Sequence, residues 1–81
     1  MLTKFVVQKS YKNSSVKVRC HDSVAEAIED AKTLYKTNEI ERKLFGFEVV
    51  VEESRFADEK RLKQDFAIDR HIRWASYFDE V

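Results

Sequence analysis

The sequence has no proline, one glycine and one cysteine among its 81 residues. A single cysteine excludes an internal disulfide framework, and with only two histidines the chain shows no zinc-ligand spacing. The chain also lacks a Gly-rich phosphate loop, a Walker-type lysine and a dinucleotide fingerprint. With so little glycine and proline, the usual means of shaping an active-site loop are missing. We therefore predict a protein that is not an enzyme and holds no metal or other cofactor.

Long apolar runs are missing as well. No segment approaches the roughly 18 apolar residues that a membrane span needs, and the first four residues are too short an apolar run for a signal peptide. The sequence thus predicts a cytoplasmic protein without a membrane partner. Apolar residues make up 43% of the chain and aromatic residues 12%, which is enough for one α+β domain over residues 1–81. Small domains often gain stability by self-association, so a homodimer is expected.

Charge is balanced overall but unevenly distributed. The chain carries 15 basic and 15 acidic residues. Residues 1–20 contain five basic side chains and no acid, residues 21–58 contain ten acidic and five basic, and residues 59–81 contain five of each. We expect a basic edge and an acidic flank, a pattern that can orient a binding partner.

The first half of the chain has the pattern of a β-hairpin followed by a helix. Residues 2–11 and 16–20 alternate apolar and polar side chains around a polar turn, which predicts two antiparallel strands. Ser23 and Glu26 form a capping box at the start of a helix that ends near Asn38. One side of this helix is apolar, with residues at spacings of three and four: Val24, Ala27, Ile28, Ala31, Leu34 and Tyr35.

The middle of the chain predicts a polar connection over residues 39–43 and a third strand over residues 44–52. Four inward side chains alternate along that strand, namely Phe45, Phe47, Val49 and Val51. Val6 and Val50 are apolar on the outward sides of their strands, which indicates a sheet partly covered on its second face.

The last stretch, residues 54–81, contains no proline, glycine or asparagine. Glu59 with Lys63, and Asp69 with Arg73, are acid-before-base pairs four residues apart, which is typical of a helix. Residues 66–74 also alternate at period two, so the alternative is a fourth strand after a short helix. The absence of turn residues and the two charge pairs favour one long helix. The predicted order is therefore β-β-α-β-α, an antiparallel N-terminal hairpin with two helices packed on a three-stranded sheet.

On a helix, the apolar residues of this stretch fall into two stripes. The first is expected to close the core and contains Phe56, Leu62, Phe66, Ala67, Trp74, Tyr77 and Phe78. The second, with Ala57, Ile68, Ile72 and Ala75, has no sheet left to cover it. We predict a protein-binding surface made of Ile68, Ile72, Arg73, Ala75 and Tyr77. The predicted function is a small interaction protein of the inhibitor or adaptor type, homodimeric through its last helix, with a composition that suits a phage or mobile-element accessory protein acting on a host protein.

The alternative function is a nucleic-acid-binding regulator that uses the basic hairpin. Four basic side chains and one ring would line a phosphate backbone and stack on a base, namely Lys9, Tyr11, Lys12, Lys17 and Arg19. The zero net charge counts against this alternative.

Two further motifs favour structural roles over chemistry. Cys20, His21 and Asp22 are adjacent on a strand and point in alternating directions, so they cannot form a catalytic relay with one another. Cys20 is instead expected to be a core or half-buried residue. His21 and His71 show no metal-ligand spacing.

Overall fold

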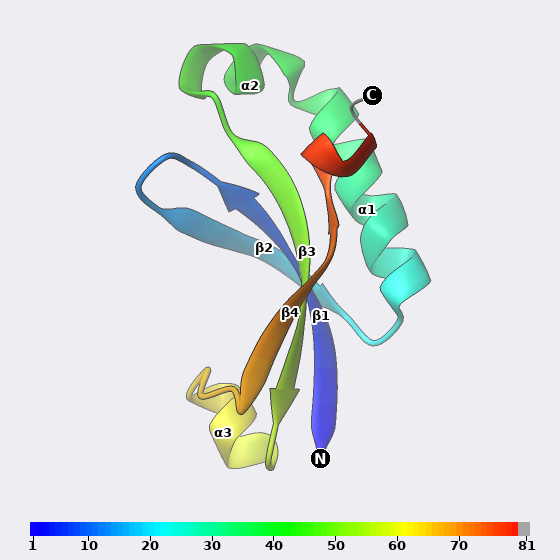
Figure 1. The fold of residues 1–81 in the computed structure, drawn as a ribbon, viewed down its shortest axis with the longest axis vertical. Helices are drawn as coiled ribbons and strands as arrows, with labels where there is room; N and C mark the ends of the chain where they lie inside the picture. Colours follow the sequence, from blue (N-terminus) through cyan, green and yellow to red (C-terminus); the bar gives the residue numbers. More distant parts are fainter. Residues whose placement is uncertain (80–81) are drawn as a thin grey trace.

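In the computed structural model, which describes residues 1–79, the chain forms a four-stranded antiparallel sheet with a long helix across one face (Figure 1). The strands lie in the order β2-β1-β3-β4. Their bounds are β1 Leu2–Ser10, β2 Ser15–His21, β3 Glu48–Phe56 and β4 Asp69–Ala75. The helices are α1 Val24–Thr37, α2 Glu39–Phe45 and α3 Glu59–Lys63, and a 3-10 turn, η1, follows at Ser76–Asp79. The predicted α+β class is confirmed.

The core lies between α1 and the sheet. Val7 on β1 and Val49 and Val51 on β3 are fully buried beneath the helix. On the helix side, Ala27 and Ala31 are fully buried too, and their small side chains let α1 approach the sheet closely. Leu34, Phe47 and Trp74 complete the buried cluster.

The ends of α1 follow the predicted signals. The backbone amide of Glu26 donates to the Ser23 hydroxyl at 3.4 Å, which caps the first turn. At the other end, the Asn38 side-chain amide donates to the Leu34 carbonyl oxygen at 2.8 Å. Asn38 is both the C-cap of α1 and the N-cap of α2, so the two helices meet at this one non-helical residue.

The predicted polar connection over residues 39–43 is wrong, because this segment is helix α2. Gly46 ends α2 in the left-handed conformation, with φ of 67° and its amide bonded to the Arg42 carbonyl. The third strand consequently begins at Glu48 rather than at residue 44. Phe45 is exposed on α2, whereas Phe47 is buried as predicted.

The predicted long helix over residues 54–81 is also wrong, and the period-two alternative describes the chain. After the short α3, a loop leads into β4, which pairs antiparallel with β3. The charge pair that favoured a helix connects strands instead, since Asp69 binds Arg55 and Arg73 binds Glu53. Oppositely charged residues can stabilise either a helix or a pair of strands. The strand forms here because it pairs with the open edge of β3.

The second face of the sheet is partly covered, as Val6 and Val50 indicated. Both valines are buried, although within residues 1–79 no long helix crosses this face. A charged bridge spans it instead: Asp65, in the turn after α3, binds Lys17 of β2 and Arg70 of β4. Arg70 also reaches Glu52 of β3 at 3.4 Å. In Figure 1, α3 lies at the opposite end of the molecule from α2.

Two phenylalanines test this fold against the predicted single helix, on which both would lie in the core stripe. Phe56 on β3 is 2% exposed, whereas Phe66 in the loop before β4 is 67% exposed. We expect Phe56→Ala to lower the free energy of unfolding by about 3 to 5 kcal/mol through loss of buried contacts. Phe66→Ala should lower it by less than about 1 kcal/mol. Urea denaturation followed by circular dichroism measures both, and equal losses would contradict the strand assignment.

Candidate interaction surfaces

The structure separates the five residues of the predicted protein-binding surface. Ile72 and Tyr77 line one hollow, and Ile68 lines a different one. Arg73 binds Glu53 on the α1 side of the sheet, and Ala75 is fully buried. The prediction that these residues form one surface depended on a long final helix and fails with it. Ile72 and Tyr77 are the pair that the fold brings together.

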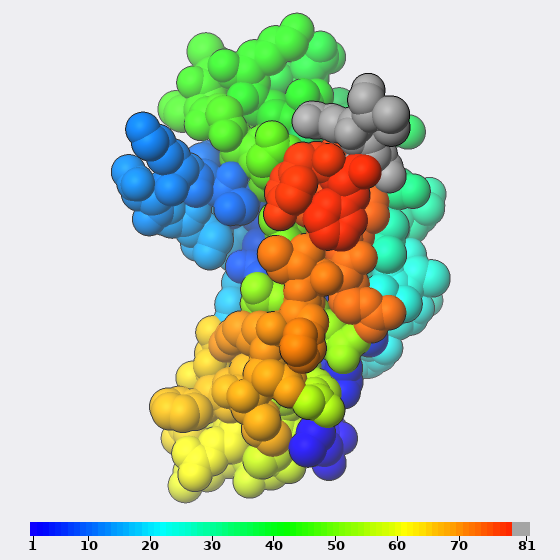
Figure 2. Space-filling model, viewed as in Figure 1, coloured from blue at the N-terminus to red at the C-terminus, as the bar shows by residue number. Residues whose placement is uncertain are grey.

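The hollow beside Ile72 and Tyr77 lies on the sheet face opposite α1 and has a volume of about 240 Å³. We call it the open-face hollow. Figure 2 shows β3 recessed on this side between the β1–β2 hairpin and β4. Val50 is the buried apolar residue in its lining, and Ile72 and Tyr77 are half-exposed beside it. The remaining lining residues are polar, namely Gln8, Ser10, Ser15, Glu48 and Glu52.

The two carboxylates of the open-face hollow are held in place by neighbours. Glu48 accepts a hydrogen bond from the Ser76 hydroxyl, which also accepts from the Val49 amide at 3.0 Å. Glu52 accepts from Arg70 at 3.4 Å. An apolar wall beside fixed carboxylates suits a side chain with an aliphatic stem and a cationic end, such as lysine or arginine.

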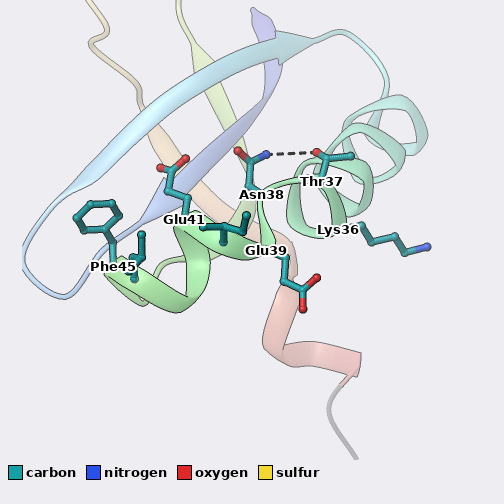
Figure 3. Close-up of a pocket in the computed structure, with 8 residues that line it drawn as sticks. Lys36, Thr37, Asn38, Glu39, Glu41 and Phe45 are labelled. Atoms are coloured by element: carbon teal, nitrogen blue, oxygen red, sulfur yellow. Dashed lines mark hydrogen bonds between the residues drawn. The ribbon is translucent and has the colours of Figure 1, made fainter.

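A second exposed apolar surface lies on α2. Ile40, Leu44 and Phe45 are all largely exposed and line a hollow of about 530 Å³ at the junction with α1. We call these three residues the α2 patch. Figure 3 shows Glu41 pointing toward the hairpin and Glu39 pointing away from it. The polar connection predicted for residues 39–43 missed this surface. Ile40 and Leu44 stand four residues apart before a glycine, and this spacing would have indicated a short helix.

The basic hairpin, the alternative site, is engaged with acidic residues of the helices. Lys9 and Tyr11 both donate to the Glu41 carboxylate of α2, each at 3.1 Å. These two donors lower the pKa of Glu41. Arg19 makes a two-pronged contact with Asp30 of α1, at 2.6 and 2.7 Å. Three of the five candidate residues therefore join the hairpin to helices on the α1 side of the sheet.

The other two candidate residues of the hairpin differ in their environment. Lys17 lies on the opposite face, where it binds Asp65. Lys12 is exposed at the hairpin turn, and within residues 1–79 it alone of the five has no bonded acid or ring. The hairpin thus presents two faces with paired charges rather than one basic strip. No feature of this geometry favours nucleic-acid binding over protein binding.

The Cys20 thiol and the imidazoles of His21 and His71 do not come together in one site. Cys20 is exposed, which corrects the expectation of a core or half-buried residue. His21 contacts Asp30 at 2.8 Å, and His71 lies on β4 in the same row of the sheet. Phe5 and Glu53 stand between the two histidines, three strand spacings or about 14 Å in all. Among residues 1–79, no group of three metal-ligating side chains comes together.

No helix within residues 1–79 combines the length and the apolar character that crossing a bilayer requires. Comparison of the chain with protein-family models, with curated proteins and with solved structures gives no match in any of the three. Function is therefore inferred from the geometry of the exposed surfaces.

The contact between Arg19 and Asp30 predicts a pH-dependent part of stability. The hydrogen bonds from Arg19, the larger cause, and from His21 lower the pKa of Asp30 from its ordinary value of 3.8 to about 2. A lowered folded-state pKa stabilises the fold above pH 4, and this stabilisation disappears as the pH falls toward 2. Asp30→Asn should lower the free energy of unfolding at pH 7 by about 1 to 2 kcal/mol, discounted because Arg19 is half-exposed.

Urea denaturation of both proteins at pH 7, 4 and 2 measures this effect. The difference between wild type and Asp30→Asn should shrink to near zero at pH 2. Asp22→Asn is the control, because Asp22 pairs with Lys4 at an exposed position and should give a smaller difference. A difference for Asp30→Asn that is constant with pH would show that Arg19 and His21 do not stabilise the charged form of Asp30.

Proposed function

We propose that this protein is a non-enzymatic binding protein that docks on another protein through the open-face hollow, in the manner of an inhibitor or adaptor. The observation that supports this proposal is the arrangement of Ile72 and Tyr77. Both side chains stand half-exposed beside the buried Val50, at the part of the sheet that α1 and α3 leave uncovered. Exposed apolar side chains grouped around a hollow mark interaction sites more often than isolated ones do.

The composition of the hollow indicates what the partner presents. Tyrosine is enriched at the energetic centres of protein interfaces, and an apolar contact beside it excludes water from neighbouring polar groups. Glu48 and Glu52 can only accept hydrogen bonds when ionised. A partner segment that fits therefore carries a lysine or arginine whose stem packs on Ile72 and Tyr77 and whose charged end meets these carboxylates.

A protein partner accounts for these features better than nucleic acid does. The carboxylates of the hollow would repel phosphates, and the lysines and arginine of the hairpin are engaged in ion pairs, Lys12 excepted. An origin in a phage or mobile element stays a prediction that is based on composition alone.

Ile72 and Ile68 form a matched pair for testing this proposal. They are 50% and 55% exposed, and they lie in different hollows. Ile72→Asp should weaken binding to a partner isolated from cells by about 30-fold or more, which is the loss expected at an interface hot spot. Ile68→Asp should change the affinity by less than about threefold. Isothermal titration with the purified partner measures both values.

The partner is first obtained by affinity capture with wild-type bait, with and without nuclease. Capture that nuclease abolishes would identify a nucleic-acid ligand and contradict the proposal. Equal losses of affinity in Ile68→Asp and Ile72→Asp would also contradict it, because the effect would then not arise in the open-face hollow. Circular dichroism should show that both variants fold, since neither side chain belongs to the buried cluster.

A further inference from the structure

Helix α2 is oriented with its polar residues toward the protein and its apolar residues toward solvent. Ile40, Leu44 and Phe45 are 78%, 72% and 67% exposed, and α2 contains no buried residue. Glu41 and Arg42, by contrast, are half-buried on the inner side. This is the reverse of the usual arrangement in a surface helix, whose apolar side faces the core.

Specific polar contacts hold α2 in this orientation. Glu41 accepts hydrogen bonds from Lys9 and Tyr11 of the hairpin, each at 3.1 Å. Arg42 donates to the Tyr35 carbonyl oxygen at 3.1 Å, and its guanidinium carbon lies 3.9 Å from the centre of the Tyr35 ring. Rotating α2 to bury its apolar side would break all of these contacts.

Both ends of α2 are fixed as well. Asn38 joins it to α1, and the Asn38 carbonyl oxygen accepts from the Arg42 amide at 2.9 Å. At the other end, the Gly46 backbone amide donates a hydrogen bond to the Arg42 carbonyl oxygen at 2.7 Å, which closes the helix. The close-up in Figure 3 shows the hydrogen bond between Thr37 and Asn38, 3.3 Å long, that ties the junction together. The α2 patch is therefore built on a fixed segment.

The charged residues beside the α2 patch would meet residues of opposite charge in a second copy related by a two-fold axis. Glu39 stands at the start of α2 and Lys43 one turn later, and the two form an exposed ion pair at 3.0 Å. If two copies of α2 pack in antiparallel fashion about the middle of the helix, Glu39 lies near the level of the partner's Lys43, and Ile40 lies near the level of the partner's Leu44. A two-fold interface requires a surface that matches itself in this way.

We propose that a second copy of this chain docks on the α2 patch, with the two α2 helices antiparallel across a two-fold axis. The contact would cover Ile40, Leu44 and Phe45 of both copies and exchange the Glu39–Lys43 ion pair within each α2 for one across the interface. A pair of seven-residue helices covers less than the ~800 Å² per partner of a standard interface. The dimer should therefore be weak, with a dissociation constant on the order of 100 µM.

This dimer leaves the open-face hollow free, because the two surfaces share no lining residue. One assembly would then carry two copies of the hollow. A partner with two matching segments would bind such an assembly more tightly than it binds a single chain.

Charge reversal at two exposed positions tests the antiparallel arrangement. Glu39→Lys alone places lysine opposite lysine, and Lys43→Glu alone places glutamate opposite glutamate, so each variant should dimerise at least about tenfold more weakly than wild type. An equimolar mixture of the two variants restores opposite charges at both contacts and should dimerise again. Analytical ultracentrifugation of the full chain from about 10 µM to about 1 mM measures all of these samples.

Substitutions in the apolar part of the patch complete the experiment. Ile40→Asp and Leu44→Asp should both sediment as monomers at about 1 mM, whereas Ile68→Asp should dimerise like wild type. Circular dichroism should confirm that the variants fold. A wild type that stays monomeric at about 1 mM would overturn the proposal, as would a dimer that survives Leu44→Asp or a mixture that fails to recover. None of these results affects partner binding at Ile72, so failure here and failure of the proposed function can be told apart.

Discussion

The packing of α1 on the sheet is the interaction on which the rest of the structure depends. Ala27 and Ala31 bring the helix against the three valines at the centre of β1 and β3. This single helix is the only long one among the described residues, and it covers one face of the sheet. A four-stranded sheet has a second face, so the remaining elements must cover that face by other means.

Charged side chains do much of that covering. The bridge through Asp65 joins β2 to β4 across this face, and it ends where the open-face hollow, which Val50 lines, begins. Asp65 has a φ of 57°, which a non-glycine residue adopts at some cost. Its two ion pairs and the turn after α3 hold it there. The covered part of this face thus ends where Arg70 and Lys17 bind Asp65, and the open part begins there.

How far the sequence predicted the structure depended on whether a pattern had one physical interpretation or two. The hairpin and α1 were predicted because alternation at period two and a capped apolar stripe have few competing interpretations. The last third of the chain was mispredicted because Asp69 and Arg73 can pair with each other on a helix or with residues of β3 in a sheet. Only the unpaired edge of β3 selects the strand, and that edge is a tertiary property. Of the predicted binding residues, Ile72 and Tyr77 lie together because of the strand and the 3-10 turn, not because of the long helix from which they were predicted.

The segment 39–45 was mispredicted for a different reason. Two of its polar residues face the protein and its apolar residues face solvent, which is the reverse of the usual arrangement. Glu41 and Arg42 suggested a solvated connection, yet they are half-buried and contact Tyr11 and Tyr35. Hydropathy assigns polar residues to the surface, and no rule based on hydropathy alone predicts an inward Glu41 with an outward Leu44. Such a reversal needs strong donors at the right place, which here are Lys9 and Tyr11 of the hairpin.

The distribution of charge along the chain then acquires a structural explanation. The basic hairpin and the acidic middle segment complement each other, and Lys9, Lys17 and Arg19 each bind an acid on another element. These pairs join β1 and β2 to α1, α2 and the turn after α3, and they leave the hairpin with little free charge. When long-range electrostatics are cancelled within the molecule, recognition depends on local contacts. The exposed apolar groups at Ile72 and on α2 are therefore the surface features on which the proposed binding depends.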